Sequence, residues 1–257
     1  MPGKTAQKGR RAAAGRDRIG GSTSTGALKI LALICMLTDH AGKMLFPNVP
    51  EMRLIGRIAF PLYCWCLVVG MEYTSSPLKY LERILLCGLL SQPLYMLALN
   101  HTWTEPNIMW TLSLGVAAIW AIRGKKLLSQ IWGPCLCLYL AQFTHADYGF
   151  RGVLLILMLY AVRSSRGGIA SVMCAFCMYW GTTSSVLRDP FGIPLSAIAN
   201  MSFYPLLAPF LRLQAMAILA LPFMLIQLPW NPKMPKWLGY ALYPMHLLLL
   251  LLLEQFM

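Results

Sequence analysis

The feature that most constrains this chain is a series of apolar stretches long enough to cross a lipid bilayer. About ten such stretches occur, most of roughly 17 to 22 residues, and an α-helix needs about 20 residues to cross the hydrocarbon core. The leucines of residues 247–253 form an unbroken run, which favours a helix over an alternating strand. The sequence therefore predicts an all-α, polytopic transmembrane helical bundle with about 8 to 10 spans.

Composition supports a membrane environment. Of 257 residues, 58% are hydrophobic and 12% are charged, whereas about 25% are charged in an ordinary soluble domain. The net charge of +13 resides in the N-terminal segment and in short loops, so it indicates contact with a bilayer and no nucleic-acid partner. The eight cysteines lie in apolar runs and predict core packing, with neither a disulfide framework nor a metal site.

The chain divides into two regions. Residues 1–26 are basic and lack apolar periodicity, which predicts a disordered cytoplasmic tail, and residues 27–257 are expected to form the transmembrane domain. The expected spans are 27–46, 56–73, 78–99, 106–122, 127–144, 150–162, 168–186, 191–211, 213–229 and 237–257. The eighth, 191–211, contains internal prolines, which predict that it is broken, re-entrant or interfacial.

Loop charges predict how the bundle is oriented. The tail holds six Lys or Arg residues, the loop 123–126 reads RGKK, and Arg163 and Arg166 follow the sixth span. Because such loops stay in the cytoplasm, the N-terminus is expected on the cytoplasmic side of the membrane, and the loop 100–105, without Lys or Arg, is expected on the outer side.

Ionisable residues inside the spans are candidate site residues, because each costs about 2.5 to 3.5 kcal/mol to insert. Asp39 could orient the imidazole of His40 for acid-base chemistry, or the two could form a structural or interfacial group. Arg53 and Arg57 are four residues apart and could bind a phosphate or an oxyanion, or anchor the span at the interface.

Other polar residues are candidates for the same cavity, although each also has a structural interpretation. Gln92 could form a helix-helix hydrogen bond, Asn107 could cap a helix, the segment from Asp147 could form a turn, and His246 could form a buried hydrogen bond. Under the predicted orientation, these candidates lie toward the outer side of the membrane, as do His40 and Arg57. This shared location predicts one polar cavity. The further candidates are Gln92, Asn107, the segment Asp147, Tyr148 and Gly149, and the pair Tyr243 and His246.

At these residues the sequence resembles the TraX family of membrane-embedded acyltransferases. The resemblance runs from about Leu28 to His246 in an ordered set of motifs. The motifs are Lys29-Ile30 to Thr38-Asp39-His40, Gly56-Arg57-Ile58-Ala59-Phe60-Pro61-Leu62, Ser91-Gln92, Asn107-Ile108, Tyr148-Gly149-Phe150-Arg151-Gly152 and Tyr243 to Leu247.

The resemblance implies an acetyltransferase that uses acetyl-CoA and modifies the N-terminal amine of conjugative pilin. Asp39, His40 and Arg57 are then the expected catalytic residues, with His40 as a general base or as the carrier of a covalent acetyl group. Arg57 or Asn107 would stabilise the oxyanion of the thioester. Acetyl-CoA would enter from the cytoplasm through a tunnel, with Arg123, Lys125 and Lys126 near its phosphates.

Three alternatives remain open at this point. The acceptor could be an envelope polysaccharide modified by O-acetylation, or the protein could be a proton-coupled transporter, since Asp, His and Arg in spans also mark proton pathways. It could also be a non-enzymatic pilus assembly factor. The sequence does not define an oligomeric state.

Overall fold

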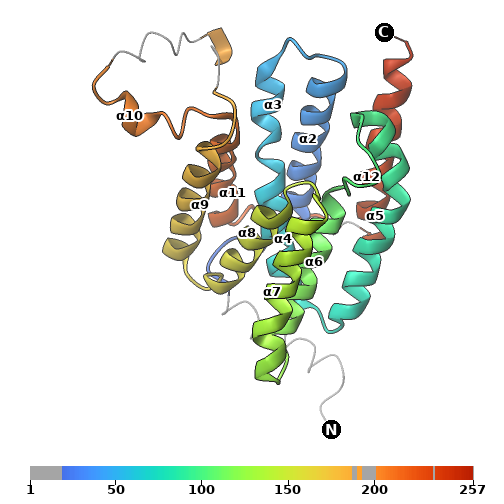
Figure 1. Ribbon diagram of the computed structural model, residues 1–257, viewed down its shortest axis with the longest axis vertical. Helices are drawn as coiled ribbons and strands as arrows, with labels where there is room; N and C mark the ends of the chain where they lie inside the picture. Colours follow the sequence, from blue (N-terminus) through green and yellow to red (C-terminus); the bar gives the residue numbers. More distant parts are fainter. Residues whose placement is uncertain (1–18, 187–189, 193–200, 234, 257) are drawn as a thin grey trace.

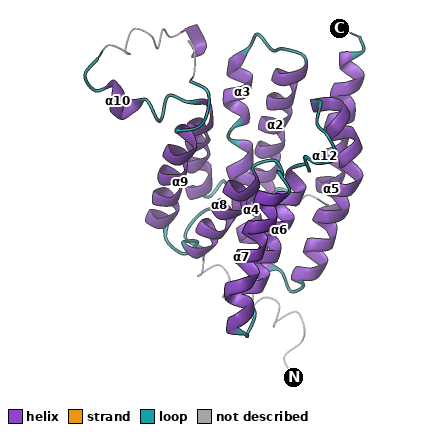
Figure 2. Ribbon diagram, viewed as in Figure 1, coloured by secondary structure: helices purple, strands orange, loops and turns teal. Residues whose placement is uncertain are grey.

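A computed structural model of the chain describes residues 19–186, 190–192, 201–233 and 235–256. These residues form a bundle of helices without a sheet, so the predicted all-α class is confirmed (Figures 1 and 2). The helices are α2 (Thr25–Met44), α3 (Pro50–Gly56), α4 (Ala59–Tyr73), α5 (Pro77–Leu99), α6 (Ile108–Ile122), α7 (Leu127–Phe143), α8 (Gly149–Ala161), α9 (Arg166–Gly181), η1 (Pro190–Gly192), α10 (Tyr204–Leu207), η3 (Leu213–Ala220), α11 (Leu221–Leu225) and α12 (Lys236–Glu254).

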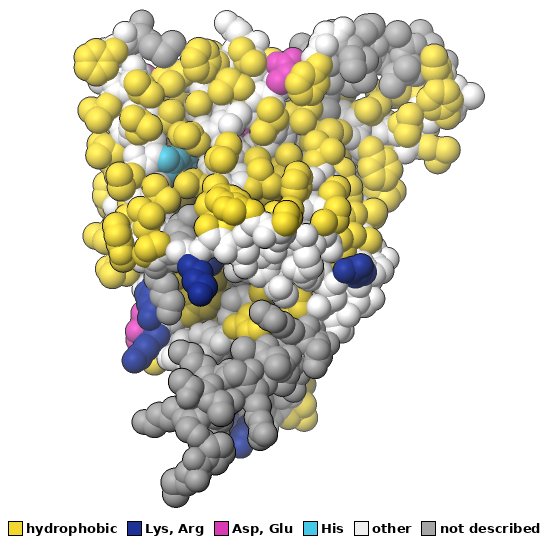
Figure 3. Space-filling model, turned by 180° about the vertical axis from the view of Figure 1, so that it is seen from behind, with side chains coloured by type: hydrophobic (Ala, Val, Ile, Leu, Met, Phe, Trp, Pro, Cys, Tyr) yellow, Lys and Arg dark blue, Asp and Glu magenta, His cyan; other side chains and the backbone are white. Residues whose placement is uncertain are grey.

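Within the described residues, three helical segments are long and apolar enough to cross a membrane. They are Pro50–Tyr73, Pro77–Leu99 and Trp237–Glu254. Shorter apolar helices cover Ile108–Ile122, Leu127–Phe143, Gly149–Ala161 and Leu213–Leu225. Many of the leucines on α5 and α12 point outward, which gives the bundle an apolar exterior suited to lipid (Figure 3).

The centre of the bundle is α4. Its sequence is apolar on every side, which is typical of a helix that is surrounded by others. Trp65 and Phe60 are among its fully buried side chains, and α4 contacts α2, α6 and α8. Because α3 and α4 follow one another with a short break at residues 57–58, they fix Arg57 at the start of the central helix.

The expected span at 191–211 is not a continuous helix in the part that can be compared, which agrees with the expectation of a broken span. That region contains only the short elements η1 and α10 among its described residues, and residues 193–200 lie outside the description. Pro205 occupies the first turn of α10, and Pro209 follows its end, so neither residue can extend a longer helix. The expected span at 213–229 is shorter than predicted, because α11 ends at Leu225.

The predicted tail also needs correction at its C-terminal end, while residues 1–18 lie outside the description. Thr25 and Gly26 already belong to α2. Ser22 is fully buried, where its carbonyl oxygen accepts a 2.8 Å hydrogen bond from Nε1 of Trp65. Its N–H donates to the carbonyl oxygen of Met224 at 2.6 Å. Residues 19–24 are therefore packed into the bundle through polar backbone contacts that apolar periodicity does not reveal.

The close approach of α2 and α3 depends on Gly56. A Cβ atom there would overlap the side chain of Asp39 on α2. We predict that Gly56→Ala lowers the free energy of unfolding by about 1–3 kcal/mol, the usual cost of overpacking. Denaturant titration in detergent micelles measures this change. The matched control is Gly167→Ala, because its Cβ would meet only Oγ of Ser165 at 3.9 Å, and an equal loss in both variants would contradict the prediction.

Candidate functional site

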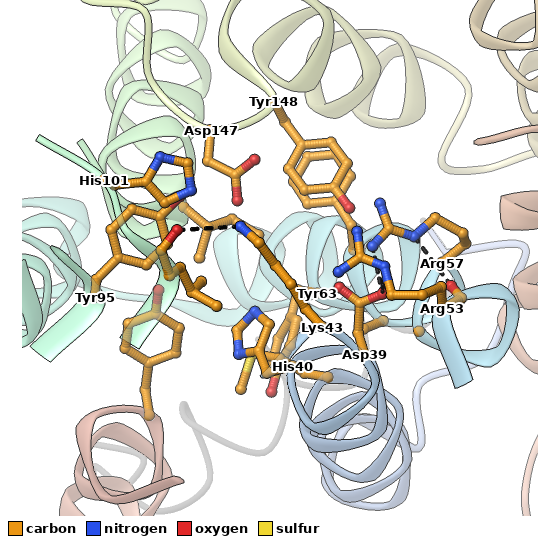
Figure 4. A pocket seen from close by; sticks show the side chains of 17 residues that line it. Asp39, His40, Lys43, Arg53, Arg57, Tyr63, Tyr95, His101, Asp147 and Tyr148 are labelled. Atoms are coloured by element: carbon orange, nitrogen blue, oxygen red, sulfur yellow. Dashed lines mark hydrogen bonds and ion pairs between the residues drawn. The ribbon is translucent and has the colours of Figure 1, made fainter. Parts of the chain in front are cut away.

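A polar cavity of about 120 Å³ lies inside the bundle. It is bounded by the C-terminal half of α2, the α3–α4 junction, the end of α5, the 147–148 turn and α12 (Figure 4). Its lining residues are Met36, Asp39, His40, Lys43, Arg53, Gly56, Arg57, Ala59, Phe60, Tyr63, Tyr95, Leu99, His101, Ile108, Asp147, Tyr148 and Tyr243. The cavity thus brings together residues from distant parts of the sequence.

Two arginines share one carboxylate at this cavity. Nη2 of Arg57 lies 2.5 Å from Oδ1 of Asp39, and Nε of Arg53 lies 3.5 Å from the same oxygen. Nε of Arg57 also donates to the carbonyl oxygen of Arg53 at 3.3 Å, which fixes its guanidinium. Because Arg57 and Asp39 are both buried, this ion pair joins α2 rigidly to the α3–α4 junction.

The expectation that Asp39 orients His40 is wrong. Successive residues of an α-helix point about 100° apart, so Asp39 and His40 face different neighbours. Asp39 faces the arginines, while Nδ1 of His40 lies 2.8 Å from Nε2 of His246 on α12. The two imidazole rings stack with their centroids 5.0 Å apart. The partner of His40 is therefore another histidine, 206 positions away in the sequence.

The hydrogen bond between the two histidines has a defined donor and a defined acceptor. Nδ1 of His246 is 3.3 Å from the carbonyl oxygen of Leu242, and because a carbonyl only accepts, this nitrogen carries the proton. In a neutral His246, Nε2 then accepts, so Nδ1 of His40 donates to it. The remaining nitrogen of a neutral His40, Nε2, is left with a lone pair. Such a nitrogen can take a proton or attack a carbonyl carbon.

The charges around the cavity are mainly positive. Nζ of Lys43 donates to the carbonyl oxygen of Leu99 at 3.3 Å, and the two arginines lie across the cavity from it (Figure 4). Asp147 also lines the cavity from the turn between α7 and α8, where burial raises the pKa of its carboxyl. The lining holds three cationic side chains, Lys43, Arg53 and Arg57, and two carboxyl groups, Asp39 and Asp147, so positive charge is in excess. The cavity suits a ligand with a carbonyl oxygen or an anionic group.

Tyr243 contributes a hydroxyl with no hydrogen-bond partner among the described residues. Its side chain is 3% exposed, lines the cavity and contacts the ring of His246 at 5.4 Å between centroids. Buried polar atoms are nearly always hydrogen-bonded, so an unpartnered hydroxyl in a cavity is typical of a group that meets a ligand. The sequence indicates Tyr243 as a candidate site residue, because Tyr243 and Pro244 interrupt an apolar helix.

Gln92 and Asn107 lie outside this cavity. Nδ2 of Asn107 donates to Oε1 of Gln92 at 2.9 Å and to the carbonyl oxygen of Gly88 at 2.8 Å, and Oδ1 accepts from the N–H of Met109. Asn107 is thus the N-cap of α6, and Nε2 of Gln92 donates to the carbonyl oxygen of Glu105. The structural interpretations of both residues hold, and the expectation that Asn107 faces the oxyanion is not supported by its position.

The turn before α8 shapes the cavity through a left-handed backbone conformation. Tyr148 and Gly149 have φ values of 61° and 41°, in the left-handed region, and this conformation aims the Tyr148 ring at Phe60. The two rings stack at 3.8 Å between centroids, and both line the cavity. Gly149 itself is absent from the lining, so it acts by shaping the turn.

Sequence reasoning missed several lining residues. Tyr95 and His101 stack on each other at 4.7 Å between ring centroids, and Tyr63 projects from the central helix. An aromatic residue in a span is usually packing, and a histidine in a polar loop is usually solvated, so neither pattern marks a site. Only Lys43, one turn beyond His40, carried a signal, because a lysine within a span needs a partner.

The fold and cavity define a class of protein: a helical bundle with membrane-spanning character and a buried site made of histidine, arginine and tyrosine. The family model described as TraX protein matches residues 24–254, and the chain belongs to the TraX family. The resemblance found in the sequence is thereby confirmed. No solved structure matches the chain.

The chain is also similar in sequence to three individual proteins. An uncharacterized protein of Rickettsia prowazekii (strain Madrid E) is 25% identical over 181 residues, which cover 68% of each chain. The probable fimbrial assembly protein FimC, serogroup H1, of Dichelobacter nodosus is 27% identical over 51% of this chain and 59% of its own. Protein TraX of Escherichia coli (strain K12) is 24% identical over 59% of this chain and 61% of its own. The match therefore spans less than two thirds of the last two relatives.

The ion pair generates a stability prediction. Asp39→Asn should lower the free energy of unfolding by about 3–5 kcal/mol, because Arg57 keeps its buried charge and loses its partner. Denaturant titration in detergent measures the loss. The control is Glu105→Gln, which removes an exposed partner of His101 and should change stability far less. Equal stability of Asp39→Asn and wild type would contradict a structural role for the pair.

Proposed function

We propose that the protein is a membrane-embedded acetyltransferase that moves an acetyl group from acetyl-CoA to an amine, with the N-terminal amine of a conjugative pilin as the expected acceptor. The observation that carries the proposal is the lone pair of His40 Nε2, held by the His246–Leu242 relay at a cation-rich cavity. Membership of the TraX family supports it, and the relative named for fimbrial assembly supports a link to pili.

The proposed reaction needs one base and one group that holds the developing negative charge. Because an α-amino group has an ordinary pKa of about 7.7–8.0, part of the acceptor is the free amine at neutral pH, and His40 takes the proton that this nitrogen loses as it attacks. The amine nitrogen forms a bond to the thioester carbonyl carbon, the carbon-sulfur bond breaks, and the proton passes from His40 to the leaving sulfur. Alternatively, the lone pair of His40 attacks the carbonyl carbon, the carbon-sulfur bond breaks and the thiolate leaves. The amine then attacks the acetyl-histidine, the bond between the acetyl carbon and His40 breaks, and the proton lost by the amine passes to the thiolate.

Tyr243 is the best-placed donor for the oxyanion. Its hydroxyl is buried and unpartnered within the described residues, whereas Asn107 is occupied as a cap and Arg57 is held by Asp39. A hydroxyl fixed in a buried site can donate to the oxygen of the tetrahedral intermediate without reorganising. We assign Arg57 and Lys43 a supporting role through their positive charge.

The proposed location is the bacterial inner membrane with the N-terminus in the cytoplasm. The α6–α7 loop that contains RGKK lies at the end of the molecule opposite the α2–α3 connection (Figure 1). Because α2 begins at this end, we call it the N-terminal end of the described bundle. Lys and Arg also gather toward this end on the visible face in Figure 3. Since the cavity uses the C-terminal half of α2, it would lie toward the outer side, where a processed pilin is expected.

The first test is intact-mass spectrometry of pilin from cells that carry the wild type, a deletion or His40→Asn. The expected result is a mass increase of one acetyl group in the wild type only, because removal of a general base lowers the rate by about 10²–10⁴-fold. The matched control is His145→Asn, an exposed histidine outside the cavity, which should keep the modification. Unmodified pilin in the wild type would refute this acceptor.

The second test concerns Tyr243. Tyr243→Phe removes only the hydroxyl and should lower kcat for acetyl transfer by about 10²–10³-fold, the usual effect of losing one oxyanion donor. Kinetics of the purified protein in detergent measure this value, and Tyr139→Phe, an exposed tyrosine on α7, is the control. A change in KM with constant kcat would contradict the oxyanion role.

One alternative has an observation in its favour. The Dichelobacter nodosus relative is named a probable fimbrial assembly protein, so a non-enzymatic assembly factor is the second candidate. In that case the cavity would only bind a pilin segment. Loss of pili in the deletion strain, with pilin of unmodified mass in the wild type, distinguishes this candidate from the enzyme.

A further inference from the structure

A second cavity, of about 160 Å³, lies in the same bundle and differs from the first in character. Most of its lining is apolar or aromatic, and Leu242, through its backbone carbonyl oxygen in the relay to His246, is the one lining residue with a proposed role in the chemistry. The lining consists of Lys29, Leu33, Tyr63, Cys66, Leu67, Tyr80, Ile84, Met109, Leu112, Pro235, Gly239, Tyr240 and Leu242. A largely apolar space of this kind suits an uncharged chain-like ligand better than a compact charged one.

The two cavities follow one another along the bundle axis. On α2, the second cavity uses residues 29–33 and the first uses residues 36–43. The same order holds on α4, α5 and α12, where residues nearer the N-terminal end of the molecule line the second cavity. Helix rise places Lys29 about 16 Å from His40 along α2. The same four helices therefore line both cavities.

Tyr63 is the boundary between the cavities, because its side chain lines both. Leu242 provides a second link. Its side chain lines the second cavity, and its carbonyl oxygen accepts from His246, which positions His40. A ligand that fills the second cavity would thus end beside the histidine pair.

Positive charge is concentrated where the second cavity meets the surface. Lys29 belongs to its lining and is exposed. Lys79 and Arg83 are exposed on α5, next in sequence to the lining residues Tyr80 and Ile84, and Glu82 is the one acid among these exposed residues. Arg123, by contrast, donates to the carbonyl oxygen of Met71 near the end of α4 and so already has a partner within the chain. The net charge is complementary to phosphate.

We propose that the second cavity holds the linear arm of a phosphorylated thioester donor, namely the pantetheine arm of acetyl-CoA, with its phosphates near Lys29 and its thioester beyond Tyr63 at His40. This inference rests on the proposed acetyl transfer and extends it by a donor site. The donor then enters from the N-terminal end of the bundle, and the acceptor reaches the first cavity from the opposite end. Tyr63 is a positioning residue at the junction.

The test is equilibrium binding of radiolabelled acetyl-CoA to the full-length protein in phosphatidylcholine nanodiscs. Gly239→Trp fills the second cavity from α12 and should raise the Kd for acetyl-CoA at least tenfold. The matched control on the same helix is Leu249→Trp, an outward-facing position, which should bind as the wild type does. Lys29→Glu, an exposed change that leaves the core intact, should also raise the Kd and remove part of its salt dependence.

The outcomes separate the donor site from the proposed function. Acetyl transfer by the wild type with an unchanged Kd in both Gly239→Trp and Lys29→Glu would overturn the donor site and leave the enzyme intact. Binding that weakens in both variants, without transfer to any amine by the wild type, would support the site and refute the function. A phospholipid that copurifies with the wild type and is lost in Gly239→Trp, without acetyl-CoA binding, would overturn the donor site in favour of a lipid.

Discussion

The arrangement of the site depends on the buried ion pair between Asp39 and Arg57. A charged group inside a bundle of this kind is stable only with a partner, and this pair lies where Gly56 allows α2 to approach α3 closely. The pair fixes the rotation of α2. Because His40 is the next residue, the same rotation turns its imidazole toward α12. One electrostatic contact thus determines which helix supplies the partner of the histidine.

The histidine pair replaces a carboxylate-histidine arrangement with a neutral relay. A carboxylate beside His40 would stabilise its protonated form, whereas the carbonyl of Leu242, acting through His246, orients the ring without adding a full negative charge. The cations Lys43, Arg53 and Arg57 surround the same space. Such a site keeps a basic lone pair available and favours an approaching carbonyl oxygen, which is the combination that acyl transfer requires.

Helix positions followed the sequence closely wherever apolar runs were long and lacked interior breaks. The bounds of α5, α6 and α7 agree with the expected spans to within a few residues. At 191–211 the prolines indicated a broken span, and the described residues there form only the short elements η1 and α10. Prediction failed at residues 19–24, where backbone hydrogen bonds to distant segments produce the order, because such bonds leave no helical period in the sequence.

The sequence by itself determined the all-α class, the family, and the fact that His40, Arg57 and Asp147 belong near one another, because polar residues in apolar spans have to share a protected space. Only the tertiary structure decided the partners. It paired Asp39 with the arginines and His40 with His246, left the buried hydroxyl of Tyr243 without a hydrogen-bond partner among the described residues, and assigned Asn107 to a helix cap. The physical reason is that a side chain's direction depends on the rotation of its helix, and packing against the other helices sets that rotation.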